Sequence, residues 1–324
     1  MKNIKFKSSR LLKTPVLFLV FNRPDTTSKV FEKIRQAKPQ RLYVASDGPR
    51  IGNDVDKEKV IMTRDIATKV DWPCEIKTLF REKNLGCKKA CSTAINWFFE
   101  YEEMGIILED DTLPHLDFFT FCENLLVRYA NDEKITAIIG TNFQNGKWRG
   151  DSSYYFSKFA HVWGWATWKR SWVHYQLDIP FWPEWRESNA WLNYKSDKVE
   201  RKYWKNIFDR IYAGEIDTWC YSWDACNWYR NVVAATPNVN LISNIGFGEN
   251  STHTKSTDSE FSNMSINKLG PITHPKKILR NLEADRWTFN HHYGGKNLRF
   301  PYNWINFPNR VIRYILKRLK EFLK

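Results

Sequence analysis

The sequence lacks a long apolar stretch. No segment approaches the roughly 18 consecutive apolar residues that indicate a membrane span. The short run from Val16 to Phe21 follows several basic residues, but it is shorter than the apolar core of a secretory signal peptide. We therefore expect a cytoplasmic protein.

The sequence also lacks the cysteine patterns of zinc sites and disulfide scaffolds. Its six cysteines form no Cys-x-x-Cys pair and have no histidine at zinc spacing. A chain of 324 residues can bury a large core and needs no disulfide to fold. The thiols are predicted to be reduced and mostly buried.

Acidic residues are outnumbered by basic ones, 36 to 50, which gives a formal charge of +14 and a field that attracts anions. The 16 Trp, 14 Tyr and 21 Phe offer stacking faces for nucleobases and sugar rings, although core packing explains most of them. A non-catalytic nucleic-acid-binding protein is one interpretation. It is opposed by diffuse positive charge and by acidic residues at predicted strand ends, which would repel a phosphate backbone.

Short apolar runs alternate with segments of helical spacing in the N-terminal part of the chain. Strands are predicted at residues 15–21, 41–46, 75–80 and 104–108, and helices at about 25–37, 60–70 and 88–101, the first capped by Asp25 or Thr26. This alternation predicts an α/β fold with an open, mostly parallel sheet flanked by helices. The tryptophan-rich region 163–228 is predicted to be more helical.

Polar side chains follow the predicted strands, at the edge where open α/β sheets bind ligands. They are Asn22, Arg23, Asp47, Arg81 and the triplet Glu109-Asp110-Asp111. Three consecutive carboxylates repel one another unless a cation lies there, and their hard oxygens suit Mn²⁺ or Mg²⁺. Without other context, an acidic turn or cap before a helix near Asp117 would be the better explanation of the triplet.

Context comes from a set of short motifs that occur in a specific order along the chain. They are Pro15-Val16-Leu17, Asn22-Arg23-Pro24, Ser46-Asp47, Asn84-Leu85-Gly86, Leu108-Glu109-Asp110-Asp111, Asp117-Phe118-Phe119, Trp163-Gly164-Trp165-Ala166-Thr167-Trp168, Asp217-Thr218-Trp219 and the segment Pro237 to Gly248. In this order the stretch from Pro15 to Thr254 resembles family 2-like glycosyltransferases of GT-A fold, including N-acetylglucosaminyltransferase I and its bacterial relatives.

The resemblance implies roles for individual residues of the donor site. Asp111 would bind the metal directly, with His253 near the metal or the diphosphate, while Glu109 and Asp110 would meet the ribose and base. Asp47 would read the uracil ring, or else only start the turn before Gly48. The remaining predicted donor-binding residues are Asn22, Arg23, Arg81, Asn84, Trp163, Gly164 and Trp165, with Gly164 allowing close approach of backbone and sugar.

Inverting transfer also needs a carboxylate that takes the proton of the attacking hydroxyl. Asp217 occupies the matching place in the motif order. Asp224 is its rival, because it lies seven residues on and could share a helix face with Asp217.

The resemblance predicts a donor-binding half at 1–150, an acceptor-side and catalytic half at 151–255, and a C-terminal extension at 256–324. The extension ends in a basic amphipathic stripe over 310–324, which suits either an anionic membrane surface or docking on the same domain. The predicted function is metal-dependent transfer from a UDP-sugar to a hydroxyl of a glycan, glycolipid or glycoprotein, as in polysaccharide biosynthesis. The alternative enzyme is a nucleotidyltransferase or nucleotide-sugar pyrophosphorylase, which would need a glycine-rich loop where Asn22-Arg23-Pro24 stands.

Overall fold

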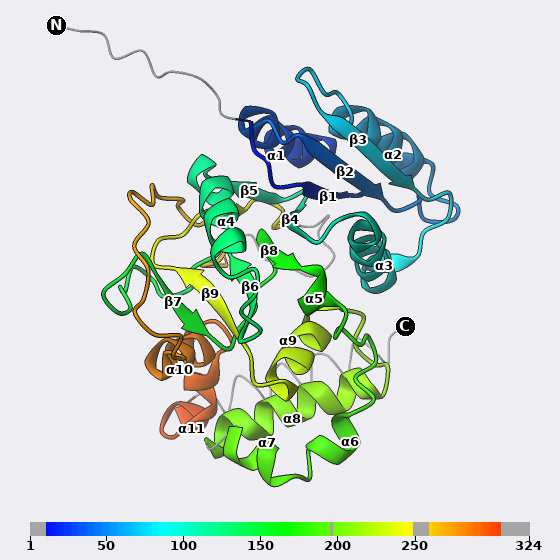
Figure 1. Ribbon diagram of the computed structural model, residues 1–324. Coiled ribbons are helices and arrows are strands. Elements are labelled where there is room, and N and C mark those ends of the chain that lie inside the picture. The colour runs from blue at the N-terminus through cyan, green and yellow to red at the C-terminus, as the bar shows by residue number, and fades with distance from the viewer. Residues whose placement is uncertain (1–10, 195–196, 249–258, 306–324) are drawn as a thin grey trace, which may run out of the picture.

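One eight-stranded sheet organises the computed structural model, which describes residues 11–194, 197–248 and 259–305 (Figure 1). The strands lie in the order β3-β2-β1-β4-β8-β6-β9-β7. Their bounds are β1 Val16–Val20, β2 Arg41–Ser46, β3 Glu75–Phe80, β4 Met104–Glu109, β6 Ile135–Ile139, β7 Tyr154–Ser157, β8 Trp165–Trp168 and β9 Val233–Pro237. A small second sheet pairs β5 Thr112–Pro114 with β10 Ile242–Asn244.

The first four strands are parallel, as the alternating pattern predicts. Strand β8 runs antiparallel to β4 and β6, which it joins, and β7 runs antiparallel to β9 at the far edge. The prediction of a mostly parallel sheet flanked by helices is confirmed, whereas these antiparallel strands were not foreseen. The sheet continues without a break across residue 150.

Side chains of alternating strand positions divide the core into two layers, because neighbouring residues of a strand face opposite sides of the sheet. Val16, Phe18 and Val20 of β1 pack with helices α1 Pro24–Ala37 and α4 Leu116–Arg128. Leu17 and Leu19 pack on the other side with α3 Gly86–Tyr101. Helix α2 Asp54–Ala67 packs beside α1.

Helix α1 begins differently from the prediction. Its N-cap is Arg23, whose side chain makes no capping bond, and Pro24 occupies the first turn. Proline has a φ that suits the first helical position, so the helix starts before Asp25, which lies in its first turn. The expected cap at Asp25 or Thr26 is therefore wrong.

The tryptophan-rich region forms a helical layer at one end of the sheet (Figure 1). Its helices are α5 Lys169–Trp172, α6 Trp182–Trp185, α7 Asn189–Tyr194, α8 Lys198–Tyr212 and α9 Cys220–Tyr229, followed later by α10 Leu282–His291, η1 Gly295–Leu298 and α11 Tyr302–Ile305. Six tryptophans of this region are fully buried, which agrees with a mainly packing role: Trp165, Trp182, Trp191, Trp204, Trp223 and Trp228.

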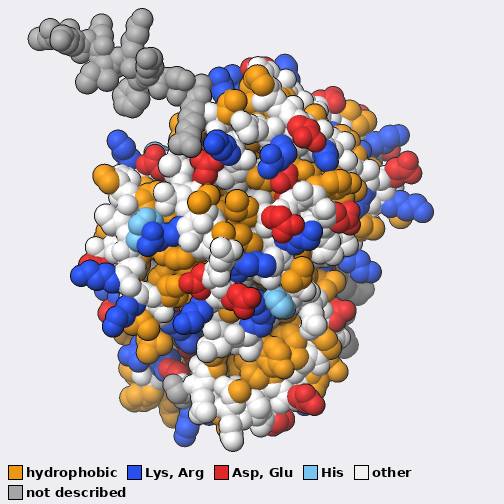
Figure 2. Space-filling view, viewed as in Figure 1, with side chains coloured by type: hydrophobic (Ala, Val, Ile, Leu, Met, Phe, Trp, Pro, Cys, Tyr) orange, Lys and Arg blue, Asp and Glu red, His pale blue; other side chains and the backbone are white. Residues whose placement is uncertain are grey.

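The six cysteines are free, as expected, but only Cys122 and Cys226 are buried. No helix among the described residues is long and apolar enough to cross a bilayer. The basic stripe over 310–324 and His253 lie outside the described residues. On the face seen in Figure 2, basic and acidic side chains are interspersed, in keeping with diffuse charge.

Candidate functional site

A cavity of about 350 Å³ opens at the carboxyl ends of β1, β2 and β4. The parallel register brings these ends together, since Leu19 lies opposite Glu109 and Val20 opposite Ser46. Most of the residues that the sequence singles out line this one cavity: Arg23, Asp47, Arg81, Asn84, Glu109, Asp110, Asp111, Trp163 and Asp217.

The acidic triplet is held from two directions. Asp110 Oδ2 accepts a hydrogen bond of 3.0 Å from the backbone N–H of Phe21, just after β1. Arg23 donates through Nη1 to Asp111 Oδ2 at 2.6 Å and lies 3.8 Å from Asp110 Oδ1. Arg23 therefore neutralises part of the triplet.

The charge of the triplet is only partly balanced. Burial, followed by repulsion from Asp111, raises the pKa of Asp110 to about 7 and that of Glu109 well above its usual range. Burial also raises the pKa of Asp111, against the opposing attraction of Arg23. Three carboxyl groups facing one guanidinium favour an added cation at this place.

Asp111, the carboxylate predicted to hold such a cation, is fixed by the backbone segment that follows β10. The N–H of Ile245 donates to the backbone oxygen of Asp111 at 2.8 Å. A Cβ on Gly246 would lie 2.1 Å from Asp111 Oδ2, so only glycine fits there. Among the described residues, no group of three or more His, Cys, Asp and Glu side chains converges as a complete metal site, so the remaining ligands would have to be substrate oxygens and water.

Asp47 ties the end of β2 to the start of α3. Its carboxylate accepts from the backbone N–H groups of Gly48, Leu85 and Gly86, at 3.0 to 3.1 Å. Both oxygens are thus used within the protein. The geometry favours the structural turn role of Asp47, and its contact with uracil stays a prediction.

The two predicted asparagines also bind the protein itself. Asn84 donates to the backbone oxygen of Gly48 at 2.8 Å while lining the cavity. Asn22 donates to Asp56 Oδ1 at 2.7 Å and is not among the cavity-lining residues, and its contact with the donor stays a prediction. Asp56 also binds Arg50, which does line the cavity and which the sequence did not single out.

Arg81 lines the cavity opposite the acidic triplet and donates through Nη2 to Thr93 Oγ1 at 2.7 Å. Burial lowers its pKa, and the nearby Asp47 carboxylate opposes that shift. Its other guanidinium nitrogens remain available to an anion, because no hydrogen bond to a described residue engages them.

The Trp163-Gly164-Trp165 segment divides between cavity and core. Trp163 lines the cavity. Trp165 is completely buried, with ring centroids 5.8 Å from Trp219 and 5.7 Å from Trp223, so it packs the core and its expected donor contact is wrong. Gly164 is required for another reason than sugar approach, since its φ is +60° and a Cβ would meet Ile242 at 2.4 Å.

The two candidate bases differ in their surroundings. Asp217 is exposed, lines the cavity, and makes no hydrogen bond or ion pair with the described residues. Its Oδ2 lies 3.8 Å from the Cβ position of Gly86, at the start of α3. Asp224 is buried on α9 and accepts from the N–H of Ala160 at 3.0 Å. Asp217 precedes α9, so the two do not share a helix face, and the geometry favours Asp217 over the buried Asp224 as the base.

One wall of the cavity comes from a face of α3 whose residues were not among those predicted for the site. Small side chains recur there at helical spacing: Cys87, Ala90, Cys91 and Ala94. Residues three and four apart lie on one helix face. Small residues in this pattern leave space for a ligand, and the pattern was visible in the sequence.

No protein-family model matches the chain, and no curated protein sequence does. Among solved structures, the arrangement is similar to a UDP-glucose pyrophosphorylase complexed with UDP-glucose, at 10% identity, covering 69% of this chain and 90% of that one with a TM-score of 0.34. It is also similar to a UTP-bound UGPase from Acinetobacter baumannii, at 8% identity, 72% and 88% coverage and a TM-score of 0.34. A likeness of this size assigns no function, which has to be argued from the cavity itself.

Proposed function

We propose that this protein is an inverting glycosyltransferase with a GT-A arrangement, which takes a sugar from a UDP-sugar and attaches it to a hydroxyl of a glycan, glycolipid or glycoprotein. The observation that carries the proposal is the meeting, in one cavity, of the acidic triplet, two arginines and the carboxylate of Asp217, which has no hydrogen bond or ion pair to a described residue. Anion-binding groups and a free base are the two requirements of glycosyl transfer from a nucleotide donor.

The chemistry follows from these positions. Asp217 accepts the proton of the acceptor hydroxyl while that oxygen bonds to the anomeric carbon. The bond from the anomeric carbon to the diphosphate oxygen breaks on the opposite face, and UDP leaves with the electron pair. Arg23 and Arg81 supply fixed guanidinium donors for the phosphate oxygens.

Asp111 fits a Mn²⁺ or Mg²⁺ ion, because its carboxylate faces the cavity within an excess of negative charge. Such an ion supplies charge neutralisation for the leaving diphosphate. Arg23, now bound to Asp111, would then be free to donate to the donor phosphates.

The test is to incubate the protein and Mn²⁺ with UDP-glucose, UDP-galactose or UDP-N-acetylglucosamine, with and without pyrophosphate. Glycosyl transfer predicts release of UDP, slowly to water and faster with an acceptor, independent of pyrophosphate. Formation of UTP that requires pyrophosphate would instead establish nucleotidyl transfer and reject the proposal. The sequence after β1 favours the first outcome, since Phe21-Asn22-Arg23-Pro24 is not a glycine-rich phosphate loop.

A further inference from the structure

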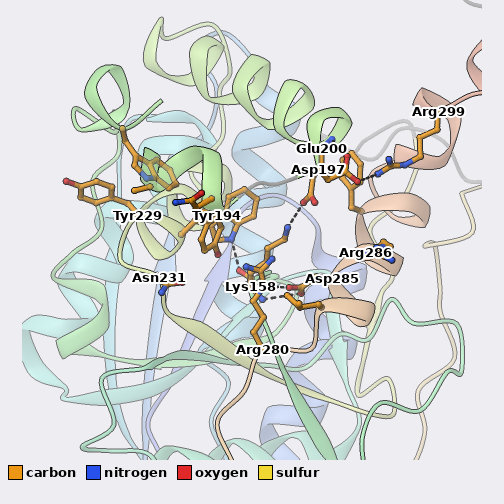
Figure 3. A pocket seen from close by; sticks show the side chains of 16 residues that line it. Lys158, Tyr194, Asp197, Glu200, Tyr229, Asn231, Arg280, Asp285, Arg286 and Arg299 are labelled. Atoms are coloured by element: carbon orange, nitrogen blue, oxygen red, sulfur yellow. Dashed lines mark hydrogen bonds and ion pairs between the residues drawn. The ribbon is translucent and has the colours of Figure 1, made fainter. Parts of the chain in front are cut away.

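A second, larger cavity of about 600 Å³ lies at the other end of the sheet from the proposed donor cavity. Figure 3 shows the side chains that line it. Lys158 lines this cavity and directly follows Ser157, the last residue of β7. Ser157 pairs with Ala234, near the start of β9. Asn231, just before β9, lines the cavity as well. The proposed donor cavity lies instead at the carboxyl ends of β1 and β4, so the two cavities are separate.

Aromatic rings form much of the wall of this second cavity. Trp185, Trp228 and Phe289 are buried beneath it, while Tyr229 is 50% exposed. The ring of Tyr229 is fixed in place by stacking on Phe181, with centroids 4.3 Å apart. Of these rings, Tyr229 is the one that leaves a fixed face open, and such a face suits the apolar face of a sugar ring.

Charged side chains fill the spaces between the rings. Three ion pairs occur in the wall: Lys158 with Glu200, Arg280 with Asp285, and Arg299 with Asp197. Figure 3 shows Lys158, Arg280 and Asp285 close together, between Tyr194 and Tyr229 on one side and Arg286 and Arg299 on the other. The pairs Lys158–Glu200 and Arg280–Asp285 are largely buried, where desolvation offsets much of their attraction, whereas Arg299–Asp197 is partly exposed. These pairs add little net stability, and they line an open cavity with charged groups.

The excess charge among the residues that line this cavity is positive. Three carboxylates are each paired with a basic side chain, and a fourth cation, Arg286, lines the cavity as well. Arg286 is exposed, and no hydrogen bond or ion pair with another described residue engages it. Arg280 uses Nε for Asp285, while its terminal nitrogens have no hydrogen bond to a described residue, and its guanidinium lies 4.9 Å from the Tyr194 ring centroid.

We propose that this cavity binds an acidic sugar residue, with the ring on Tyr229 and its carboxylate or phosphate group at Arg280 and Arg286. Guanidinium groups bind both anions through paired N–H donors. The site is non-catalytic and independent of the proposed donor cavity. It would hold part of an anionic glycan at a distance from the place where sugar is transferred.

The test is calorimetric titration of the full chain with three probes. These are a hyaluronan tetrasaccharide, which carries glucuronate, then glucose 1-phosphate, and the neutral chitotetraose. We expect at least one acidic probe to bind and the neutral one to bind at least tenfold more weakly. Binding of the tetrasaccharide alone would identify a sugar carboxylate as the ligand group, and binding of glucose 1-phosphate alone a sugar phosphate.

Variants connect binding to the cavity. Arg286→Gln removes an exposed cation without breaking an ion pair seen in the structure, and should weaken binding of the acidic probe about tenfold, because a charge-assisted hydrogen bond to the anion is lost. The control is Arg210→Gln, at an exposed arginine of α8 outside the cavity, which loses only a surface ion pair with Glu215 and should bind the probe like the parent. The proposal would be overturned if neither acidic probe bound, or if the neutral probe bound with equal affinity. It would also be overturned if Arg286→Gln bound the acidic probe like the parent, or if saturating UDP displaced that probe.

Discussion

Replacement of Asp217 by Asn tests the assignment of the general base. The change keeps the size of the side chain but removes its ability to take a proton. A positioned general base contributes about 10²- to 10⁴-fold to a reaction rate, or about 3 to 5.5 kcal/mol of activation free energy. Because Asp217 is exposed and has no hydrogen-bonding partner among the described residues, we expect its replacement to leave the unfolding temperature unchanged.

The assay is steady-state release of UDP from a UDP-sugar, with calorimetric binding of UDP as the control for an intact donor cavity. Asp217→Asn should lose turnover and keep its affinity for UDP. Asp224→Ala should instead keep its turnover and lose about 1 to 3 kcal/mol of unfolding free energy, because the buried N–H of Ala160 is left unpaired. A loss of turnover in Asp217→Asn smaller than about tenfold would refute Asp217 as the base.

Three further predictions concern packing and pH. Trp165→Ala should destabilise the fold by about 3 to 5 kcal/mol in denaturant titration, whereas Trp163→Ala should cost less stability and weaken binding of the UDP-sugar. Gly246→Ala should raise the dissociation constant for UDP at least about tenfold in calorimetry, because its new Cβ would displace the Asp111 carboxylate at an overpacking cost of about 1 to 3 kcal/mol. Burial lowers the pKa of His292 to about 3 in the folded protein. An unfolded histidine has a pKa near about 6.5, so below that pH the unfolded chain binds a proton at His292 that the folded chain does not. Unfolding free energy should therefore drop by about 2 kcal/mol between neutral pH and pH 5 through this group, and His292→Phe should show a shallower dependence.

The sequence predicted the N-terminal part of the sheet well, because short apolar runs bounded by polar residues leave few alternatives. Strands β2 and β3 have the predicted bounds. Since parallel strands end at a common edge, the convergence of Arg23, Asp47 and the acidic triplet followed from the same pattern.

Individual side-chain roles were harder to predict, because they depend on contacts between distant segments. Trp163 and Trp165 are identical residues two positions apart, and nothing in the sequence separates their roles. Trp163 lines the cavity, whereas Trp165 packs against α9. Choosing Asp217 over Asp224 required knowing that α9 begins after Asp217 and that Asp224 accepts a hydrogen bond from Ala160. The antiparallel strand β8 was missed because its residues read as part of a continuous aromatic region.

We propose above that the cavity at the ends of β1 and β4 binds a nucleotide diphosphate through Asp111 and a divalent metal. The most direct test is calorimetric titration of UDP with and without Mn²⁺, on the parent protein and on Asp111→Asn. We expect binding that depends on Mn²⁺ and is lost in the variant. Absence of UDP binding by well-folded parent protein, or equal metal-dependent binding by both proteins, would contradict this proposal.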